Sequence, residues 1–330
     1  MNAANYSRST RTTAPTAQHR DAHAGAYEIP GALAGLRLDQ ALACLLPEHS
    51  RSRLRSWIDA GHVSVDGRAW DAKRRVAGGE RIAVRAPEVA ASIGDAPEAI
   101  ALDVVFEDAA LIVVDKPPGL VVHPGSGNRV GTLLNALLHH DPSLASVPRA
   151  GIVHRLDKDT SGLMVVARTI EAHTDLVRQL AAREIRREYL AVAHGDIARA
   201  MIVDAPIGRH PTQRTTMAVV ERGKPARTHL SVVERFGPAT LVRCRLETGR
   251  THQIRVHLAA IGHALVGDSA YGARRTRTAS MRVPAFARQA LHAALLSLAH
   301  PTTRRTLCFE AKPPADFAAL VAALRAQSTA

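Results

Sequence analysis

The stretch His154–Gly162, HRLDKDTSG, places two carboxylates, two cations and a histidine within six residues. The apolar run Leu163–Ala167, LMVVA, follows directly and is typical of a buried strand. One interpretation is a solvated turn, because Asp-Thr-Ser-Gly is ordinary turn chemistry whose side chains bond to local N–H groups. The other is an active site that uses the carboxylate of Asp157, with Asp159 forming the turn.

A second charged segment, Leu246–His257 (LETGRTHQIRVH), bears on this choice because it carries Arg250 and Arg255. A buried carboxylate stays ionised only when a cation or several donors offset its desolvation. An arginine from this distant segment would do so for Asp157 without a metal ion. The two segments together favour the active-site interpretation.

Composition sets broad limits on the partners and the compartment. The chain has 330 residues, a formal net charge of +13 and a sequence pI near 10.7, which favours an anionic partner, nucleic acid first and an anionic membrane second. Its cysteines, Cys44, Cys244 and Cys308, form no CxxC pair, so neither a disulfide framework nor a cysteine zinc site is expected. With no apolar leader and no run of eighteen apolar residues, a cytoplasmic protein is expected.

The sequence predicts four regions. Residues 1–28 are polar and small and are expected to form a disordered tail. Residues 29–86 read as a small domain of two short helices and a hairpin that turns at Asp66-Gly67. Residues 87–100 are a linker by their Pro and Ala content, and residues 101–325 form the larger domain.

The larger domain mixes strand and helix patterns with few regular crossovers. Helices are predicted near residues 132–140 and 169–184, and a turn into a helix within residues 251–262. Strands are predicted near residues 111–114, 120–122, 163–167, 185–195, 226–236 and 240–249. This order predicts an α+β fold with a mixed, largely antiparallel sheet, and argues against a doubly wound parallel sheet.

Several familiar site patterns are missing from the sequence. Gly125–Thr132, GSGNRVGT, has the spacing GxGxxxG and is more typical of a tight glycine turn than of a dinucleotide-binding loop. His252 and His257 are five residues apart and no HExxH occurs, which argues against a zinc site. No GxSxG elbow is present either. We therefore expect no metal ion and no cofactor.

Aromatic residues are scarce, and between residues 110 and 285 they are Tyr189, Phe236 and Tyr271. An enzyme that takes a base out of an RNA stack needs a flat side chain to hold it. Tyr189, in the strand-like segment RREYLAV, is the best placed of the three. Its alternative is an ordinary core tyrosine.

The motif Gly151–Arg168, GIVHRLDKDTSGLMVVAR, resembles the signature of the RluA/RluD family of RNA pseudouridine synthases. Further blocks agree with the family in order, namely DKPPGLVVHPG (115–125), REYLAV (187–192) and GRTHQIRVHLAAIGHALVGDSAYG (249–272). The likeness covers about residues 30–320. The segments RLDQALACLLPEHSRSRL and WIDAGHVSVDG resemble the small RNA-binding domain named after small-subunit ribosomal protein four.

The resemblance implies the pseudouridine synthase fold, a mixed α/β catalytic domain with a long, mostly antiparallel sheet and an RNA cleft. It implies isomerisation of uridine to pseudouridine in large-subunit rRNA, without cofactor or metal, with the stem-loop called helix 69 as the target. The partner would be this rRNA or its assembling ribosomal particle, and we expect a monomer with no membrane partner.

The family motifs also imply a role for individual residues. Asp157 matches the essential carboxylate, Arg155 the loop arginine that helps to displace the target nucleotide, and Tyr189 the tyrosine that stacks on the base. Arg255 matches the arginine paired with the carboxylate, and Ile254 the apolar wall of the pocket.

Arg51, Arg53 and Arg55 are expected to bind RNA phosphates, although a solvated helix face explains them equally well. Two other functions stay open: a pseudouridine synthase for another rRNA site or a tRNA site, and a non-catalytic RNA-binding assembly factor. The intact Asp157 and Tyr189 count against the second.

Overall fold

The structure, a computed structural model, forms two compact units, Met1–Ser92 and Ile93–Ala330, which are considered separately. It describes residues 21–46, 49, 51–87, 96–125, 127–213, 215–272 and 283–328. Most of the expected tail and linker, and residues 273–282, lie outside this description. None of the described helices combines the length and apolar character that a membrane span requires.

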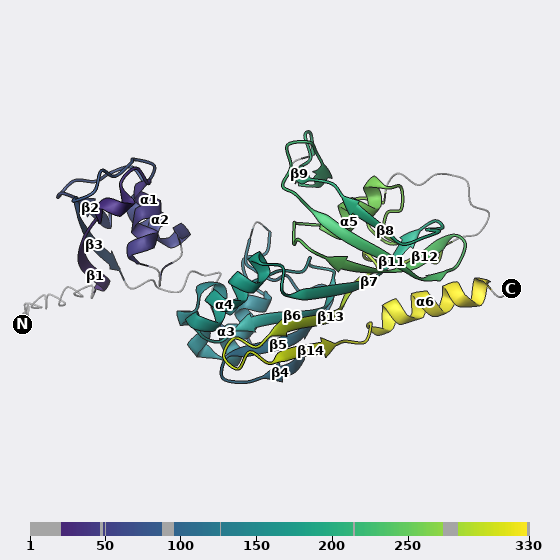
Figure 1. Cartoon of the computed structure of the whole chain (residues 1–330). Coiled ribbons are helices and arrows are strands. Elements are labelled where there is room, and N and C mark those ends of the chain that lie inside the picture. The colour runs from purple at the N-terminus through teal and green to yellow at the C-terminus, as the bar shows by residue number, and fades with distance from the viewer. Residues whose placement is uncertain are drawn as a thin grey trace, which may run out of the picture. The chain divides into compact units, whose positions relative to one another are not determined.

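The first unit packs two helices against a small sheet (Figure 1). Its helices are α1 (Leu38–Leu45) and α2 (Arg51–Asp59), as the apolar spacing predicted. The sheet has the antiparallel order β1-β3-β2, with β1 (Asp21–Glu28), β2 (Val63–Val65) and β3 (Arg81–Pro87). The core combines residues from both helices and the sheet, including Leu38, Leu42, Leu54, Val63, Ile82 and Val84.

Two predictions for this unit are wrong in detail. Residues 21–28, expected in the disordered tail, form β1, because the main chain pairs with β3 and Tyr27 packs against the core of the unit. The turn at Asp66-Gly67 is present, with φ of 51° and 75°. However, β2 pairs with β3 rather than with the residues that follow the turn, apart from one bridge between Val65 and Arg68.

The second unit is built on a nine-stranded sheet of order β4-β5-β6-β13-β7-β12-β11-β8, with β14 paired to β13. Every pairing is antiparallel except that of β6 with β13, which confirms a mixed and mostly antiparallel sheet. The strands are β4 (Val104–Glu107), β5 (Leu111–Lys116), β6 (Ser161–Ala167), β7 (Arg186–His194), β8 (Met201–Asp204), β11 (Arg227–Arg235), β12 (Ala239–Leu246), β13 (Leu291–Ala299) and β14 (Thr306–Glu310).

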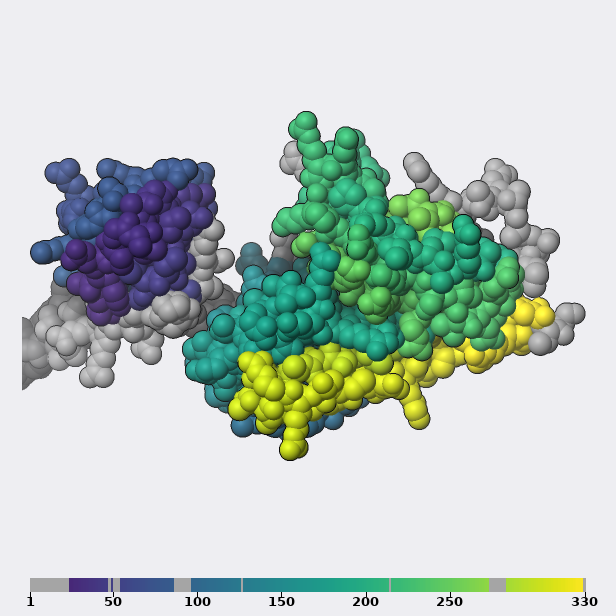
Figure 2. Space-filling model, viewed as in Figure 1, coloured from purple at the N-terminus to yellow at the C-terminus, as the bar shows by residue number. Residues whose placement is uncertain are grey.

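The remaining elements of this unit flank the sheet. Its α-helices are α3 (Leu133–His140), α4 (Ile170–Ala181), α5 (Gln253–Ala260) and α6 (Ala315–Ser328). The two short strands β9 (Ile207–Arg209) and β10 (Met217–Val219) pair with each other, and the segment around β9 projects from the body of the unit (Figures 1 and 2). Two 3-10 turns, Pro142–Ser146 and Pro148–Gly151, lead from α3 toward β6.

A close approach of two strands fixes where β6 begins. Gly162 has φ +114°, and a Cβ there would lie 2.3 Å from the carbonyl oxygen of Ala293 on β13. Only glycine adopts this conformation and leaves that space. The parallel pairing of β6 with β13 therefore holds the end of the HRLDKDTSG segment against the middle of the sheet.

Candidate active site

Asp157 lies on the loop between the 3-10 turn Pro148–Gly151 and β6, and hydrogen bonds from backbone and side chains hold this loop. The N–H of Thr160 donates to the carbonyl oxygen of Asp157 at 3.0 Å. Arg288 Nη1 donates to the carbonyl oxygen of Asp159 at 2.9 Å, and Gln289 Nε2 donates to Thr160 Oγ1 at 3.2 Å. The loop is thus tied to the segment that precedes β13.

Lys116, the last residue of β5, is 1% exposed and bonds to the same loop at Lys158. Its Nζ donates to the carbonyl oxygens of Pro117 at 2.7 Å, Leu120 at 2.9 Å and Lys158 at 2.9 Å. Burial lowers the pKa of Lys116 to about 8. The sequence gives one signal for this buried amine, a lysine that directly continues an apolar strand.

Arg255 on α5 joins Asp157 to a third residue, Asp268. Its Nη1 donates to Asp157 Oδ2 at 3.0 Å, while its Nε and Nη2 donate to Asp268 Oδ2 and Oδ1 at 2.7 and 2.9 Å. Arg255 is 8% exposed and the Asp268 side chain is fully buried. Burial alone would lower the pKa of Arg255, but the two carboxylates outweigh it and raise the pKa above its ordinary value.

His252 lies beside the same carboxylate, with its Nε2 3.8 Å from Asp157 Oδ1. Its backbone is left-handed, with φ of 56°, at the start of α5. Its Nδ1 is 2.8 Å from the hydroxyl of Tyr271, which accepts from the N–H of Met217 at 2.9 Å. Burial lowers the pKa of His252, which therefore stays neutral near pH 7. Spacing alone gave no reason to place His252 next to Asp157.

A cavity of about 790 Å³ brings together the five residues predicted for this site, Arg155, Asp157, Tyr189, Ile254 and Arg255. Tyr189 on β7 is buried, which raises the pKa of its hydroxyl, and Ile254 is buried as well. Arg155 is exposed and Asp157 is half-buried. Four further arginines line the cavity and give it a basic wall, namely Arg149, Arg183, Arg187 and Arg250.

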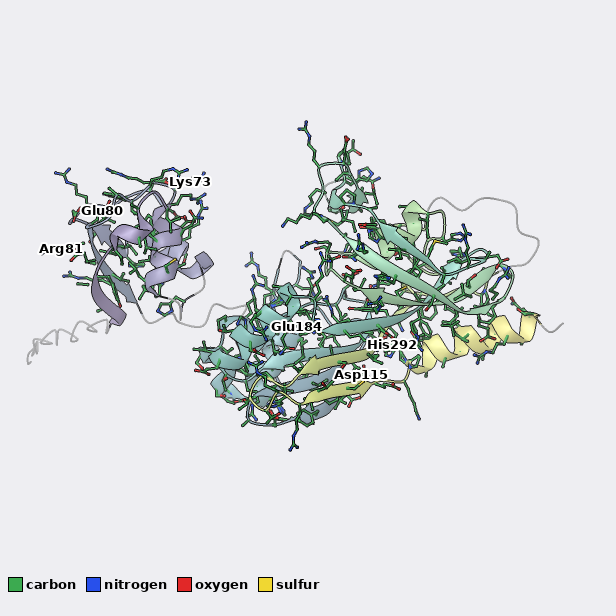
Figure 3. The ribbon with its side chains drawn as sticks, viewed as in Figure 1. Lys73, Glu80, Arg81, Asp115, Glu184 and His292 are labelled. Carbon is green, nitrogen blue, oxygen red and sulfur yellow. The ribbon has the colours of Figure 1, made fainter. Side chains whose placement is uncertain are left out.

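The arginines predicted on the first unit are described only in part. Arg51 begins α2, but the side chains of Arg51 and Arg53 lie outside the described residues. Arg55 is exposed and lies 3.5 Å from Asp59. The same unit carries other exposed basic side chains that the prediction missed, among them Lys73 and Arg81, which Figure 3 shows at its surface. Throughout the described part of the chain, no cluster of three His, Cys, Asp or Glu side chains is arranged to hold a metal ion.

Each of the two units matches a known protein family or domain. The sequence model of the RNA pseudouridylate synthase family matches residues 110–260, and that of the S4 domain matches residues 36–82. The ribosomal large subunit pseudouridine synthase D of Nitrosomonas europaea is 56% identical, covering 90% of this chain and 87% of that protein. The protein of the same name from Pseudomonas aeruginosa is 51% identical, covering 91% and 95%.

Solved structures show the same catalytic fold. The human RNA pseudouridylate synthase domain containing 1 aligns with a TM-score of 0.52 at 29% identity, over 69% of this chain and 96% of that one. The human domain containing 4 aligns with a TM-score of 0.54 at 26% identity, over 68% and 93%. With this identity, this coverage and the cavity built around Asp157, the chain belongs to the RNA pseudouridylate synthase family, a family of isomerases.

Proposed function

We propose that this protein converts uridine to pseudouridine in large-subunit rRNA, with Asp157 as the catalytic carboxylate and the helix 69 stem-loop as the target. The observation that carries the proposal is Asp157 itself, held at 3.0 Å by the buried Arg255 inside a basic cavity next to Tyr189. The names of the relatives at 51–56% identity support the choice of RNA. The net charge of +13 and the S4 domain match support an RNA partner.

The isomerisation requires an enzyme that holds the uracil base and stabilises the charge that develops in the transition state, and it needs no redox partner. The bond from the ribose C1′ to N1 of uracil breaks, the base rotates, and a bond from C1′ to C5 forms. The proton of C5 leaves and N1 gains one, so atoms and electrons balance without a cofactor. The carboxylate of Asp157 assists the departure of the base, either by attacking the nucleotide or through a glycal intermediate. Arg255 keeps that carboxylate in one orientation.

The other residues of the cavity would hold the displaced nucleotide. Tyr189 offers a ring for stacking, and Ile254 an apolar wall. Arg155, exposed on the loop that carries Asp157, would occupy the place the nucleotide leaves in the RNA helix. Flipping a base costs a few kcal/mol of stacking and pairing, which these contacts would offset.

The first unit would add affinity for the RNA backbone through Arg51, Arg53 and Arg55. We place the enzyme in the cytoplasm as a monomer, acting on the rRNA or on its assembling particle. The exposed arginine Arg55 on α2 supports a backbone contact, since its only described partner is the exposed Asp59.

Mapping pseudouridines in a transcribed large-subunit rRNA treated with the enzyme tests the proposal. New pseudouridines within helix 69 are expected. Modification at other uridines of the rRNA, or of a tRNA, would instead assign a different site. If neither free RNA nor immature ribosomal particles were modified while RNA still bound, the protein would be a binding factor rather than an enzyme for this RNA.

A further inference from the structure

Arg187 is a second buried arginine of the cavity, and it has no counter-charge. It lies on β7, two residues before Tyr189, so both side chains leave the same face of the strand. Arg187 is 8% exposed, as buried as Arg255. Among the described residues no carboxylate lies within 4 Å of its guanidinium, and its buried Nε has no hydrogen-bond partner.

A buried cation with no partner is costly, because the desolvation of the charge is not offset. In Arg255 this cost is offset by two carboxylates, those of Asp157 and Asp268, which accept its hydrogen bonds. The acidic neighbour of Arg187 in sequence, Glu188, does not serve, because it accepts from Arg186 and Arg243. The free enzyme therefore holds a charge that a ligand would neutralise.

A second orphaned donor lines the same cavity. His154 Nε2 accepts from the N–H of Val165 at 3.1 Å, so the ring proton is on Nδ1. That Nδ1 is buried and has no partner among the described residues. Burial and the charge of Arg187 lower the pKa of His154 to about 3, so the ring stays neutral and Nδ1 remains a donor.

Near Arg187, one acidic side chain of the cavity is already paired, and a glycine leaves room for the guanidinium. The lining carboxylate of Glu247 is bonded to Arg183 at 2.7 Å and to His229 at 2.6 Å. A Cβ on Gly249 would lie 2.9 Å from Arg187 Nη1, so only a glycine at this position allows the guanidinium to lie where it does. An anion that enters the cavity thus meets the guanidinium of Arg187, and His154, whose Nδ1 has no partner among the described residues and is shut off from solvent in the free protein, belongs to the same lining.

We propose that Arg187 and His154 form a subsite for one phosphate group of the RNA strand next to the target uridine. The inference rests on the proposed function and adds to it a contact that fixes which nucleotide of the RNA strand lies at the cavity. A phosphate supplies the full negative charge that Arg187 lacks, whereas a base carbonyl supplies only an acceptor. With the backbone fixed there, the adjoining nucleotide is delivered toward Tyr189, on the same face of β7, and toward Asp157.

The substitution Arg187→Met separates this role from a structural one. Removing an uncompensated buried charge should leave the thermal midpoint of the free enzyme unchanged or higher, while RNA affinity falls about tenfold or more. The salt dependence of binding should weaken by about 0.7 in the logarithmic slope, the value for one phosphate contact on a single strand. Arg305→Met, at an exposed arginine outside the cavity, is the matched control and should change none of these quantities.

Neutral methylphosphonate links, placed one at a time around the target uridine, identify the phosphate. One position should weaken binding to the wild-type enzyme and have no further effect on Arg187→Met. Two results would overturn this subsite alone. In the first, the wild type modifies the RNA and Arg187→Met binds it with full affinity. In the second, Arg187→Met loses thermal stability and its RNA affinity still falls at the same methylphosphonate positions as that of the wild type. A wild type that neither binds nor modifies the RNA would overturn the proposed function and the subsite together.

Discussion

The guanidinium of Arg255 lies between two carboxylates of different exposure: Asp268, whose side chain is fully buried, and Asp157, whose side chain is 15% exposed toward the cavity. Asp268 accepts hydrogen bonds from two nitrogens of Arg255, Nε and Nη2, and the third nitrogen, Nη1, donates to Asp157. Asp268 also accepts from the backbone N–H groups of Ala270 and Tyr271. The orientation of Asp157 therefore depends on a residue that does not reach the cavity.

Asp268→Asn should lower both activity and stability. The change leaves Arg255 buried with one charge partner, and removing one partner of a buried ion pair costs about 3 kcal/mol. Misplacing Arg255 would also misplace Asp157, and turnover should fall roughly 100-fold. Urea unfolding and single-turnover kinetics measure the two effects. Glu234→Gln, which breaks an exposed pair with Arg325, is the control and should cost below about 1 kcal/mol; equal losses in both variants would contradict this reading.

Lys116 should make stability depend on pH in the alkaline range. Its pKa is lowered from 10.5 to about 8 in the folded protein. Between these values the unfolded chain binds more protons than the folded one, so the free energy of unfolding rises as pH rises from 8 to 10.5. The gain is about 3 kcal/mol for this group, at 1.36 kcal/mol per pKa unit. Lys116→Met should remove the slope, and urea unfolding at pH 7.5, 9 and 10.5 compares the two proteins; parallel curves would contradict the prediction.

Gly162→Ala should destabilise the junction of β6 with β13. The new Cβ would meet the backbone of Ala293, which has no flexible end to move aside, so a loss of about 3 kcal/mol is expected. Gly262→Ala is the matched control, because Gly262 also has a positive φ, +85°, but open space around it. It should cost about 1 kcal/mol in chemical denaturation. Equal costs would mean that backbone conformation, and not the close approach, sets the requirement for glycine.

Much of the catalytic fold could be predicted from the sequence because its signals are local. The apolar run after HRLDKDTSG became β6, and the spacing of apolar residues near 132–140 became α3, which Thr132 caps through the N–H of Asn135. The strand β1 escaped prediction because Tyr27 is its one large apolar side chain against the core and the rest depends on main-chain pairing, which leaves no mark on composition. The partner of β2 was missed because the chain passes the adjacent turn and pairs with a later strand.

The residues of the candidate site divide in the same way. Asp157, Tyr189 and Arg255 belong to motifs that resemble the family, and they line one cavity. Asp268, Lys116 and Arg187 lie in blocks that agree with the family as well, but their contacts depend on burial, which a single sequence does not display. Asp268 lies in an ordinary turn sequence and reads as exposed until the packing is known, whereas Lys116 has one signal, the apolar strand that it continues.

Release of tritium from C5 of uridine in a transcribed large-subunit rRNA tests the central claim most directly. Wild type and Asp157→Asn would be compared on the same RNA, with binding measured in parallel. We expect release by the wild type and none by the variant, with RNA affinity retained, because asparagine keeps the shape of the side chain and removes its charge. Normal release by Asp157→Asn would contradict the assignment of Asp157 as the catalytic carboxylate.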